Sequence, residues 1–304
     1  MGGQTLSIII VNWNTCDLLR ICLESAYRTT ADIHPEVIVV DNGSSDGSPA
    51  MVSKEFPSVR LIQNTTNLGF ARANNQAFQV STGDFILLLN SDAFLKEGAA
   101  NSLVHTMEAH PDIGITGARL VYLDGRPQVS FEKLPNLYSE SLRLAGLDKV
   151  FWRLSRGQKT SNTHDYYEVG VVSGACLMVR RVMVEQIGLF DENFFMFNEE
   201  TDLCFRAHAA NWKVVHNPAA QAAHVGGGST GVTPERVLRL YKAKLLYFQK
   251  HDGEKAKNQL FMVMRLLVGV KLVVYTLIAK IYSGRVQKAT FWRQVQIGLG
   301  DFQL

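Results

Sequence analysis

The sequence predicts an α/β fold built on a mostly parallel central sheet. Apolar, β-branched runs of strand length alternate with segments of helical periodicity from residue 6 to about residue 110. The runs are continuous rather than alternating, which is typical of strands buried on both faces of a sheet. Strand and helix in alternation favour right-handed βαβ crossovers and therefore parallel strands.

The first part of the chain supplies four predicted strands and three predicted helices. Each strand is followed by a segment whose apolar residues recur at helical spacing, as Leu19, Leu23 and Ala26 do after the first. The predicted strands are 6–12, 36–41, 59–64 and 84–92, and the predicted helices are 15–28, 49–56 and 69–81.

The second part is less regular. Residues 125–168 have no clear period, and we expect a loop or a helix pair that covers the site, since long irregular segments are often lids. We then expect a strand over 169–181, a helix over 181–190, a turn and helix over 191–212, and a strand with a Gly-rich loop over 213–229.

Composition sets limits on function. The 304 residues are 46% hydrophobic, enough for a sizeable core, and the formal net charge is only +3. A nucleic-acid-binding protein would be expected to concentrate basic residues in one patch, so we predict no nucleic-acid partner.

Polar side chains stand where each of the first four predicted strands ends. Ligands of open parallel sheets bind beyond the carboxyl ends of the strands. Polar loop residues can also simply form turns, above all in "DNGSSDGS", but their repetition at four strand ends favours a binding edge. The residues concerned are Asn12, Trp13, Asn14, Asp41, Asn42, Asn64, Asn90 and Asp92.

Six segments together resemble a known family: "IIIVNWN", "VIVVDNGSSDGS", "NTTNLGFARANNQAF", "FILLLNSD", "SGACLMVRR" and "GLFDENFFMFNEETDLCFRAHAANWKVVHNPAAQAAHVGGGST". Their order and spacing are similar to those of inverting family-2 glycosyltransferases, in the bacterial rhamnosyltransferase-like branch, over residues 5 to 232. The resemblance implies a GT-A fold, with a Rossmann-like, mostly parallel sheet flanked by helices. It implies a catalytic domain over 1–232, divided into a nucleotide-sugar half (1–110) and an acceptor half (111–232), with a C-terminal helical extension over 233–304.

The resemblance also implies a nucleotide-sugar donor and a divalent cation, Mg²⁺ or Mn²⁺. Such cations take hard oxygen ligands and neutralise a departing diphosphate. "NSD" matches the family's DxD-type motif, so Asp92 is the expected metal ligand, although Asn90 replaces the first acidic residue. His224 matches a histidine that often binds the same metal. Asp92 could instead be a cap or turn residue, and a lone histidine is usually structural.

The acidic cluster "NEETD" matches the position of the family's general base, which removes the proton from the acceptor hydroxyl. The match assigns this role to Glu200, where the family commonly has Asp, with Glu199 as the alternative. If a helix begins here, Glu199 and Asp202 share a face near its N-terminus, and an acidic first turn could serve only to stabilise the helix.

Donor binding is expected along the polar edge. By resemblance, Asn12 and Asn14 lie beside the nucleotide, Asp41 accepts from the pyrimidine or ribose, and Arg72 faces the diphosphate. Asn75 is expected to support the same loop, and Trp13 could stack on a base or pack internally. The complete predicted donor set is Asn12, Asn14, Asp41, Asn42, Arg72, Asn75, Asn90 and Ser91.

The segment 259–284 is strongly apolar and long enough to cross a bilayer if helical, but Arg265, Lys271 and Lys280 interrupt it. It could lie on a membrane surface, pack on the catalytic domain or form an oligomer contact. We favour peripheral membrane contact, because the family often uses polyprenol-linked acceptors and because Phe291 and Trp292 suit an interface.

The sequence as a whole predicts a metal-dependent inverting glycosyltransferase. We expect it to transfer rhamnose from dTDP-rhamnose, or another sugar from a dTDP- or UDP-sugar, to a cell-surface glycan or its polyprenol-linked precursor. The expected location is the cytoplasm, at the inner face of the plasma membrane. The alternatives are a nucleotidyltransferase, which would want a Gly-rich phosphate loop that "VNWNTCDLL" lacks, and an inactive nucleotide-sugar-binding or scaffold protein.

Overall fold

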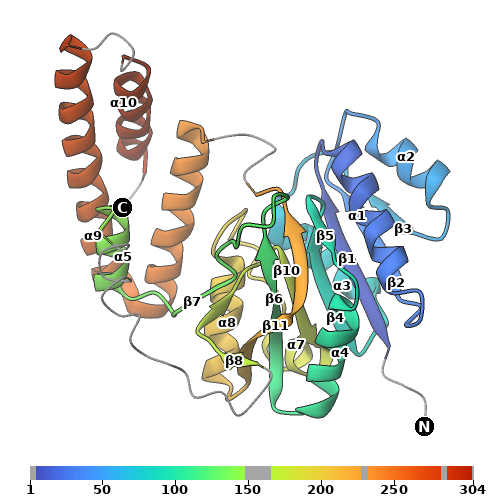
Figure 1. The fold of residues 1–304 in the computed structure, drawn as a ribbon. Coiled ribbons are helices and arrows are strands. Elements are labelled where there is room, and N and C mark those ends of the chain that lie inside the picture. Colours follow the sequence, from blue (N-terminus) through green and yellow to red (C-terminus); the bar gives the residue numbers. More distant parts are fainter. Residues whose placement is uncertain (1–4, 148–165, 227–231, 282–285, 303–304) are drawn as a thin grey trace. The chain divides into compact units, whose positions relative to one another are not determined.

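The computed structural model describes residues 5–147, 166–226, 232–281 and 286–302 (Figure 1). They belong to two compact units. The first comprises Met1–Leu134, Ser161–Phe195 and Glu199–Ser229, and the second comprises Pro135–Thr160, Met196–Asn198 and Thr230–Leu304.

The first unit is built on a sheet with the strand order β3-β2-β1-β4-β10-β6-β11-β5, and β8 also pairs with β11. The first four strands are mutually parallel, as predicted, whereas β10 runs antiparallel to both β4 and β6. A separate two-stranded sheet joins β7 to β9. The bounds are β1 Leu6–Asn12, β2 Glu36–Asp41, β3 Arg60–Gln63, β4 Phe85–Asn90, β5 Ala93–Leu95, β6 Ile113–Val121, β7 Phe131–Glu132, β8 Tyr167–Glu168, β9 Val171–Val172, β10 Cys176–Arg180 and β11 Lys213–His224.

Helices cover both faces of the large sheet (Figure 1). In β1, Ile8 and Ile10 pack in one core with Leu23 of α1, and Ile9 packs in the other core with Ala73 of α3. This period-2 alternation between two apolar cores explains why the strand is apolar at every position. The helices of this unit are α1 Cys16–Thr29, α2 Ser48–Glu55, α3 Phe70–Val80, α4 Ala99–Ala109, α7 Arg181–Ile187 and α8 Glu199–Ala209. Both ends of α1, α2 and α3 lie within one residue of the predicted limits.

The expected strand over 169–181 is wrong as a single element. It is divided into β9 and β10 by a turn at Ser173–Ala175. The backbone groups of this turn bond to different segments: Ser173 N donates to Ser130 O at 2.9 Å, and Ala175 O accepts from Asn90 N at 3.0 Å. Of the predicted lid over 125–168, residues 148–165 lie outside the described part of the chain.

The second unit is helical, with α5 (Leu137–Leu144), α9 (Pro234–Ile281) and α10 (Val286–Gly300). Gly253, with φ +83°, breaks α9 into two limbs, a conformation that glycine adopts without strain. An ion pair at 2.7 Å joins Lys244 of α9 to Glu140 of α5, and both side chains are buried. The apolar segment 259–284, as far as it is described, belongs to the second limb of α9. This helix packs against α10 within the unit.

Candidate functional site

The four parallel strands bring their polar ends to one edge of the sheet. Asn12 of β1 is in register with Asp41 of β2, and its neighbour Val11 is in register with Asn90 of β4. The polar strand ends therefore lie together, because the carboxyl ends of neighbouring parallel strands lie side by side, and binding at this edge stays a prediction.

A buried hydrogen-bond network connects these strand ends. The Asn12 Nδ2 atom donates to Asp41 Oδ2 at 2.9 Å and lies 3.1 Å from Ser44 Oγ. Thr15 Oγ1 donates to Asn12 Oδ1 at 2.6 Å and lies 2.9 Å from Ser91 Oγ. Asn12, Asp41 and Ser91 are thus brought together, and the network orients them from β1, β2 and β4. Thr15, which the sequence did not single out, links the first and fourth strand ends.

Asn14 and Trp13 lie in the loop that follows β1. Asn14 has φ +53°, and its Oδ1 accepts a hydrogen bond from Ser45 N at 2.8 Å, which fixes this loop against the one that follows β2. Trp13 is predicted either to stack on a base or to pack internally. Its side chain is 40% exposed, so it is at most partly packed and is not a core residue.

Asn42 holds the loop before α3. Its Nδ2 donates to Gly69 O at 3.1 Å, and its Oδ1 accepts from Asn64 Nδ2 at 3.0 Å. Gly69 has φ +90°, and a Cβ there would lie 2.6 Å from Phe195 O, so only glycine fits this close approach.

Arg72 and Asn75 face the segment 190–192. The Asn75 side chain accepts from Phe190 N at 3.1 Å and donates to Phe190 O at 2.9 Å. Arg72 Nε lies 3.8 Å from Glu192 Oε2, and both side chains are at least half exposed. Asn75 therefore anchors this loop, and Arg72 remains accessible to a ligand.

The structure brings Asp92 and His224 together. Val225 N donates to Asp92 O at 3.0 Å, and β11 pairs with β5 so that His224 is in register with Ala93. As a result His224 Nε2 lies 3.3 Å from Asp92 Oδ1, with both side chains about 15% exposed. A carboxylate oxygen and an imidazole nitrogen at this separation suit a divalent cation of the Mn²⁺ type.

Among the described residues, Asp92 and His224 would supply only part of a coordination shell. The described residues contain no group of three or more His, Cys, Asp or Glu side chains that could hold a metal ion. Asn90, two residues before Asp92, has a buried Oδ1 atom without a hydrogen-bond partner among the described residues, so it is a polar atom whose desolvation is uncompensated. A site with two protein ligands fits a cation such as Mg²⁺, whose remaining positions are commonly filled by the phosphates of a bound nucleotide and by water.

Glu199 and Glu200 begin α8 and have different environments. Glu199 is 5% exposed and its Oε2 has no hydrogen-bond partner in the described structure, whereas Glu200 is half-buried. Burial, followed by the neighbouring negative charge of Glu200, raises the pKa of Glu199 well above its ordinary value. Glu200 lies against Gly174, where an added Cβ would be 3.6 Å from its own Cβ. Glu200 is therefore the more accessible carboxylate.

Asp202 is not available as a base. It is fully buried and forms an ion pair at 2.8 Å with Arg206, one turn later in α8. This residue of the acidic cluster therefore has a structural partner, which the sequence did not indicate.

The raised pKa of Glu199 predicts a pH-dependent stability. A buried carboxyl that stays protonated in the folded state contributes most below its unfolded pKa, near 4.5, and this contribution is lost as the pH rises towards the higher folded pKa. In that window we expect the free energy of unfolding to fall by up to about 1.4 kcal/mol per pH unit relative to Glu199→Gln. Urea denaturation at several pH values measures the difference. The matched control is Glu185→Gln, an exposed position of α7; equal pH profiles for wild type and Glu199→Gln would contradict the prediction.

Comparison with known proteins identifies the family. The family model described as "Glycosyl transferase family 2" matches residues 7–188. An N-acetylglucosaminyl-diphospho-decaprenol L-rhamnosyltransferase of Mycobacterium tuberculosis (strain ATCC 25618 / H37Rv) is 30% identical over 234 residues, which cover 71% of this chain and 76% of that protein. The low-salt glycan biosynthesis hexosyltransferase Agl10 of Haloferax volcanii is 26% identical over 72% of this chain and 66% of its own length.

Two solved structures share the fold. The mannosyltransferase PcManGT from Pyrobaculum calidifontis, in complex with GDP-Man and Mn²⁺, aligns with a TM-score of 0.58 at 15% identity, over 99% of this chain and 87% of that chain. GalNAc-T7 with UDP, GalNAc and Mn²⁺ aligns with a TM-score of 0.60 at 15% identity, over 84% of this chain and 52% of that chain. These likenesses confirm the predicted GT-A fold.

The family match supports a glycosyltransferase over a nucleotidyltransferase. The chain belongs to glycosyl transferase family 2 and is a glycosyltransferase with the GT-A fold.

Proposed function

We propose that this enzyme transfers rhamnose from dTDP-rhamnose, with inversion at the anomeric carbon, to a polyprenol-linked precursor of a cell-surface glycan. The Mycobacterium tuberculosis relative, an N-acetylglucosaminyl-diphospho-decaprenol L-rhamnosyltransferase, supports both the sugar and the lipid-linked acceptor. The observation that carries the proposal is the 3.3 Å approach of His224 Nε2 to Asp92 Oδ1 at the carboxyl edge of the parallel strands, where a donor diphosphate is expected.

Asp92 and His224 would hold the cation, Mg²⁺ or Mn²⁺. When bound, such a cation neutralises the negative charge that develops on a departing diphosphate. Two solved structures of the same fold contain Mn²⁺, which supports this assignment.

Glu200 would act as the general base. Its half-buried carboxylate accepts the proton of the acceptor hydroxyl as that oxygen attacks the anomeric carbon and the bond to the diphosphate breaks. Glu199 is the less suitable base, because burial and its neighbour favour its protonated form.

The remaining predicted donor residues would line the nucleotide side. Asn12, Asp41 and Ser91 lie in one network, and Asn14 and Asn42 fix the adjoining loops. Arg72, whose side chain is 57% exposed, would pair with the diphosphate in place of Glu192.

Donor turnover and binding test the assignment. The panel is dTDP-rhamnose, UDP-glucose, UDP-galactose, UDP-GlcNAc and GDP-mannose, each with Mg²⁺, Mn²⁺ or EDTA, for wild type and Asp92→Ala. We expect turnover of dTDP-rhamnose that needs the cation and falls by at least about 100-fold in Asp92→Ala, since a lost metal ligand affects the transition state directly. Selective use of another donor would refute the rhamnose assignment, and binding of none would refute the proposed activity.

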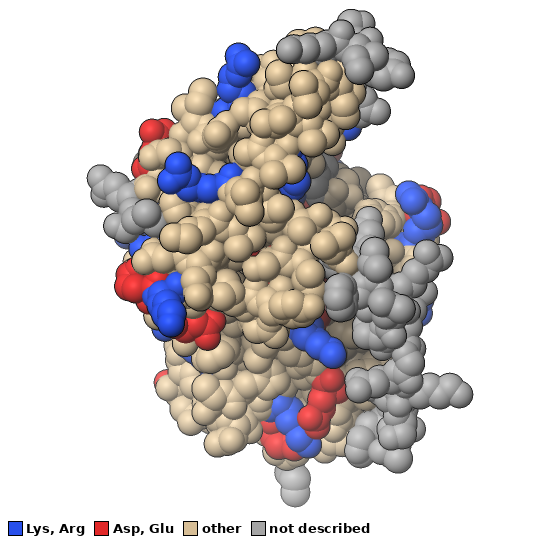
Figure 2. Space-filling model, turned by 90° about the vertical axis from the view of Figure 1, so that its left-hand side faces the viewer, with Lys and Arg blue, Asp and Glu red and all other residues tan. Residues whose placement is uncertain are grey.

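We further propose that the second unit rests on the cytoplasmic face of the plasma membrane. Among the described residues, α9, over Pro234–Ala279 and including the break at Gly253, is long and apolar enough to cross a membrane by length and composition, and only 17% of its most apolar window is buried. Figure 2, which faces the left-hand side of Figure 1, shows uncharged residues over most of the visible surface, with separate groups of Lys and Arg and of Asp and Glu between them. The side chains of one helical face are exposed: Met262, Leu266, Val270, Val273, Val274 and Leu277.

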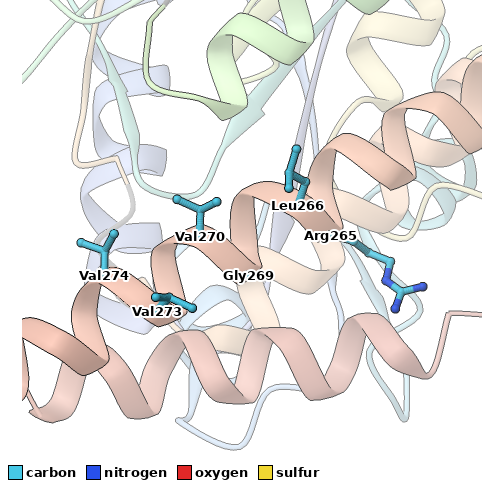
Figure 3. A pocket seen from close by; sticks show the side chains of 6 residues that line it. All are labelled: Arg265, Leu266, Gly269, Val270, Val273 and Val274. Atoms are coloured by element: carbon cyan, nitrogen blue, oxygen red, sulfur yellow. The ribbon is translucent and has the colours of Figure 1, made fainter.

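The cations of this segment are compatible with a surface position. Lys271 Nζ donates to Leu144 O at 3.2 Å and lies 4.6 Å from the centroid of the Trp292 ring, so it turns inward within this unit. Arg265 lies at one end of a shallow pocket, next to the exposed apolar residues (Figure 3). The other residues that line this pocket are Leu266, Gly269, Val270, Val273 and Val274. An apolar face bordered by a cation is typical of helices that lie in the membrane interface.

Membrane contact is testable with the double variant Val270→Glu/Val273→Glu. We expect wild type to sediment with vesicles of anionic lipid and the variant to stay in solution, because two carboxylates would have to enter the apolar layer. Val182→Glu, at an exposed position of α7, is the matched control. If wild type does not bind vesicles but forms a dimer that the double variant dissolves, the face is an oligomer contact.

A further inference from the structure

Gln128 lies in the segment between β6 and β7, and its side chain contacts His224. Its backbone is fixed, because Gln128 N donates to Leu120 O at 2.9 Å. Its Nε2 atom donates to His224 O at 2.6 Å, and its Oε1 atom lies 3.0 Å from His224 Nδ1. One amide therefore contacts both the backbone and the ring of the same histidine.

The orientation of this amide follows from the chemistry of its partners. A backbone carbonyl oxygen can only accept a hydrogen bond, so the NH₂ group of Gln128 must face His224 O. The amide oxygen then faces Nδ1, and because that oxygen can only accept, Nδ1 must carry the hydrogen. A neutral imidazole has one N–H, which leaves Nε2 with a lone pair.

That lone pair lies on the side of Asp92, since Nε2 is the atom 3.3 Å from Asp92 Oδ1. Nε2 and Asp92 Oδ1 are then both acceptors, and two acceptors this close repel each other unless both bind the same cation. Histidine ligands of metals commonly donate their other N–H to an oxygen, which fixes the tautomer and the orientation of the ring. We propose that Gln128 is the positioning residue of the cation site, which sets the tautomer and the angle of His224 so that Nε2 and Asp92 converge on one ion.

Gly226 is an independent part of the same arrangement. It has φ +63°, and a Cβ there would lie 3.1 Å from Gln128 Nε2 and 3.6 Å from His224 Nδ1. A side chain at this position would push on the amide and the ring together. The glycine therefore allows the close contact between Gln128 and His224.

The inference rests on the proposed cation site, and its first test does not need the cation. Two-bond ¹H–¹⁵N NMR spectra of histidine-labelled, metal-free protein, recorded over a range of pH, distinguish the two neutral tautomers of each ring from its doubly protonated form. His224→Gln assigns the signal. We expect the Nδ1–H tautomer for His224 in wild type and in Gln128→Glu, which keeps an oxygen acceptor, and a shift towards Nε2–H in Gln128→Met. A wild-type Nε2–H tautomer would overturn the inference.

The second test is the affinity for Mn²⁺, alone and with dTDP or UDP, by electron paramagnetic resonance. Gln128→Met should weaken Mn²⁺ binding about 10- to 100-fold, as loss of such supporting partners does at other sites. The matched control is Gln186→Met, which also removes an amide, here one that accepts from Trp212 Nε1 at 2.8 Å, and should leave Mn²⁺ affinity unchanged.

The two tests separate the inference from the proposed function. Unchanged Mn²⁺ affinity in Gln128→Met would overturn the inference while the proposed function stands. If wild type shows the Nδ1–H tautomer but Asp92→Ala binds Mn²⁺ as well as wild type does, the proposed cation site fails, and with it the metal-positioning role. A tautomer shift together with weakened binding supports both.

Discussion

Glu200→Gln should lower sugar transfer by about 10²- to 10⁴-fold, the usual contribution of a general base. The amide has nearly the same shape but cannot accept the acceptor's proton, so kcat should fall while donor binding stays unchanged. The assay is transfer from dTDP-rhamnose to an N-acetylglucosaminyl-diphospho-lipid, with donor affinity measured by calorimetry on the same samples. Glu200→Asp, which restores a carboxylate with one methylene fewer, should recover part of the lost rate.

Glu199→Gln is the comparison that makes this test specific. Because burial raises the pKa of Glu199 and so favours its protonated form, a neutral amide replaces this side chain with little change in shape and charge. We therefore expect Glu199→Gln to keep most of the activity. The assignment of the base would be refuted if Glu199→Gln were inactive and Glu200→Gln active.

The choice between these two glutamates shows what the sequence could and could not predict. Adjacent residues on a helix point about 100° apart, so one faces the protein and the other faces outward. Which is which is set by tertiary packing: Glu199 is 5% exposed, whereas Glu200 is half-buried beside Gly174, in a turn between two strands that the sequence suggested were one. The family resemblance indicated Glu200, but the physical reason lies in tertiary packing.

The binding edge could be predicted because it depends on local rules. Parallel strands that alternate with helices must place their carboxyl ends together, so Asn12, Asp41 and Asn90 could be grouped from their positions alone. The insertion of β10 between β4 and β6 could not be predicted from the sequence. It pairs residue 177 with residues 88 and 117, which are far away in the chain. Gln128 was missed for the same reason, since it lies 96 residues from His224 in a segment without a motif.

Asp202→Ala should destabilise the first unit by about 3–5 kcal/mol, the usual cost of removing one partner of a buried ion pair. Asp202 is fully buried, and its partner Arg206 also donates to Ile187 O at 2.7 Å and Gly188 O at 3.0 Å, carbonyls at the end of α7. Without the carboxylate, the guanidinium keeps its charge but loses its only described ionic partner at short range, and α7 loses a well-oriented cation at its C-terminus.

Urea denaturation of the full chain, followed by circular dichroism, measures this loss. The matched control is Glu55→Ala, which removes one partner of an exposed ion pair with Arg20 at 2.8 Å and should destabilise far less than Asp202→Ala, because solvent screens exposed pairs. Asp202→Asn keeps a hydrogen-bond acceptor without the charge, so an intermediate loss would indicate that the charge itself matters. If Asp202→Ala costs as little as Glu55→Ala, the ion pair does not hold α7 to α8.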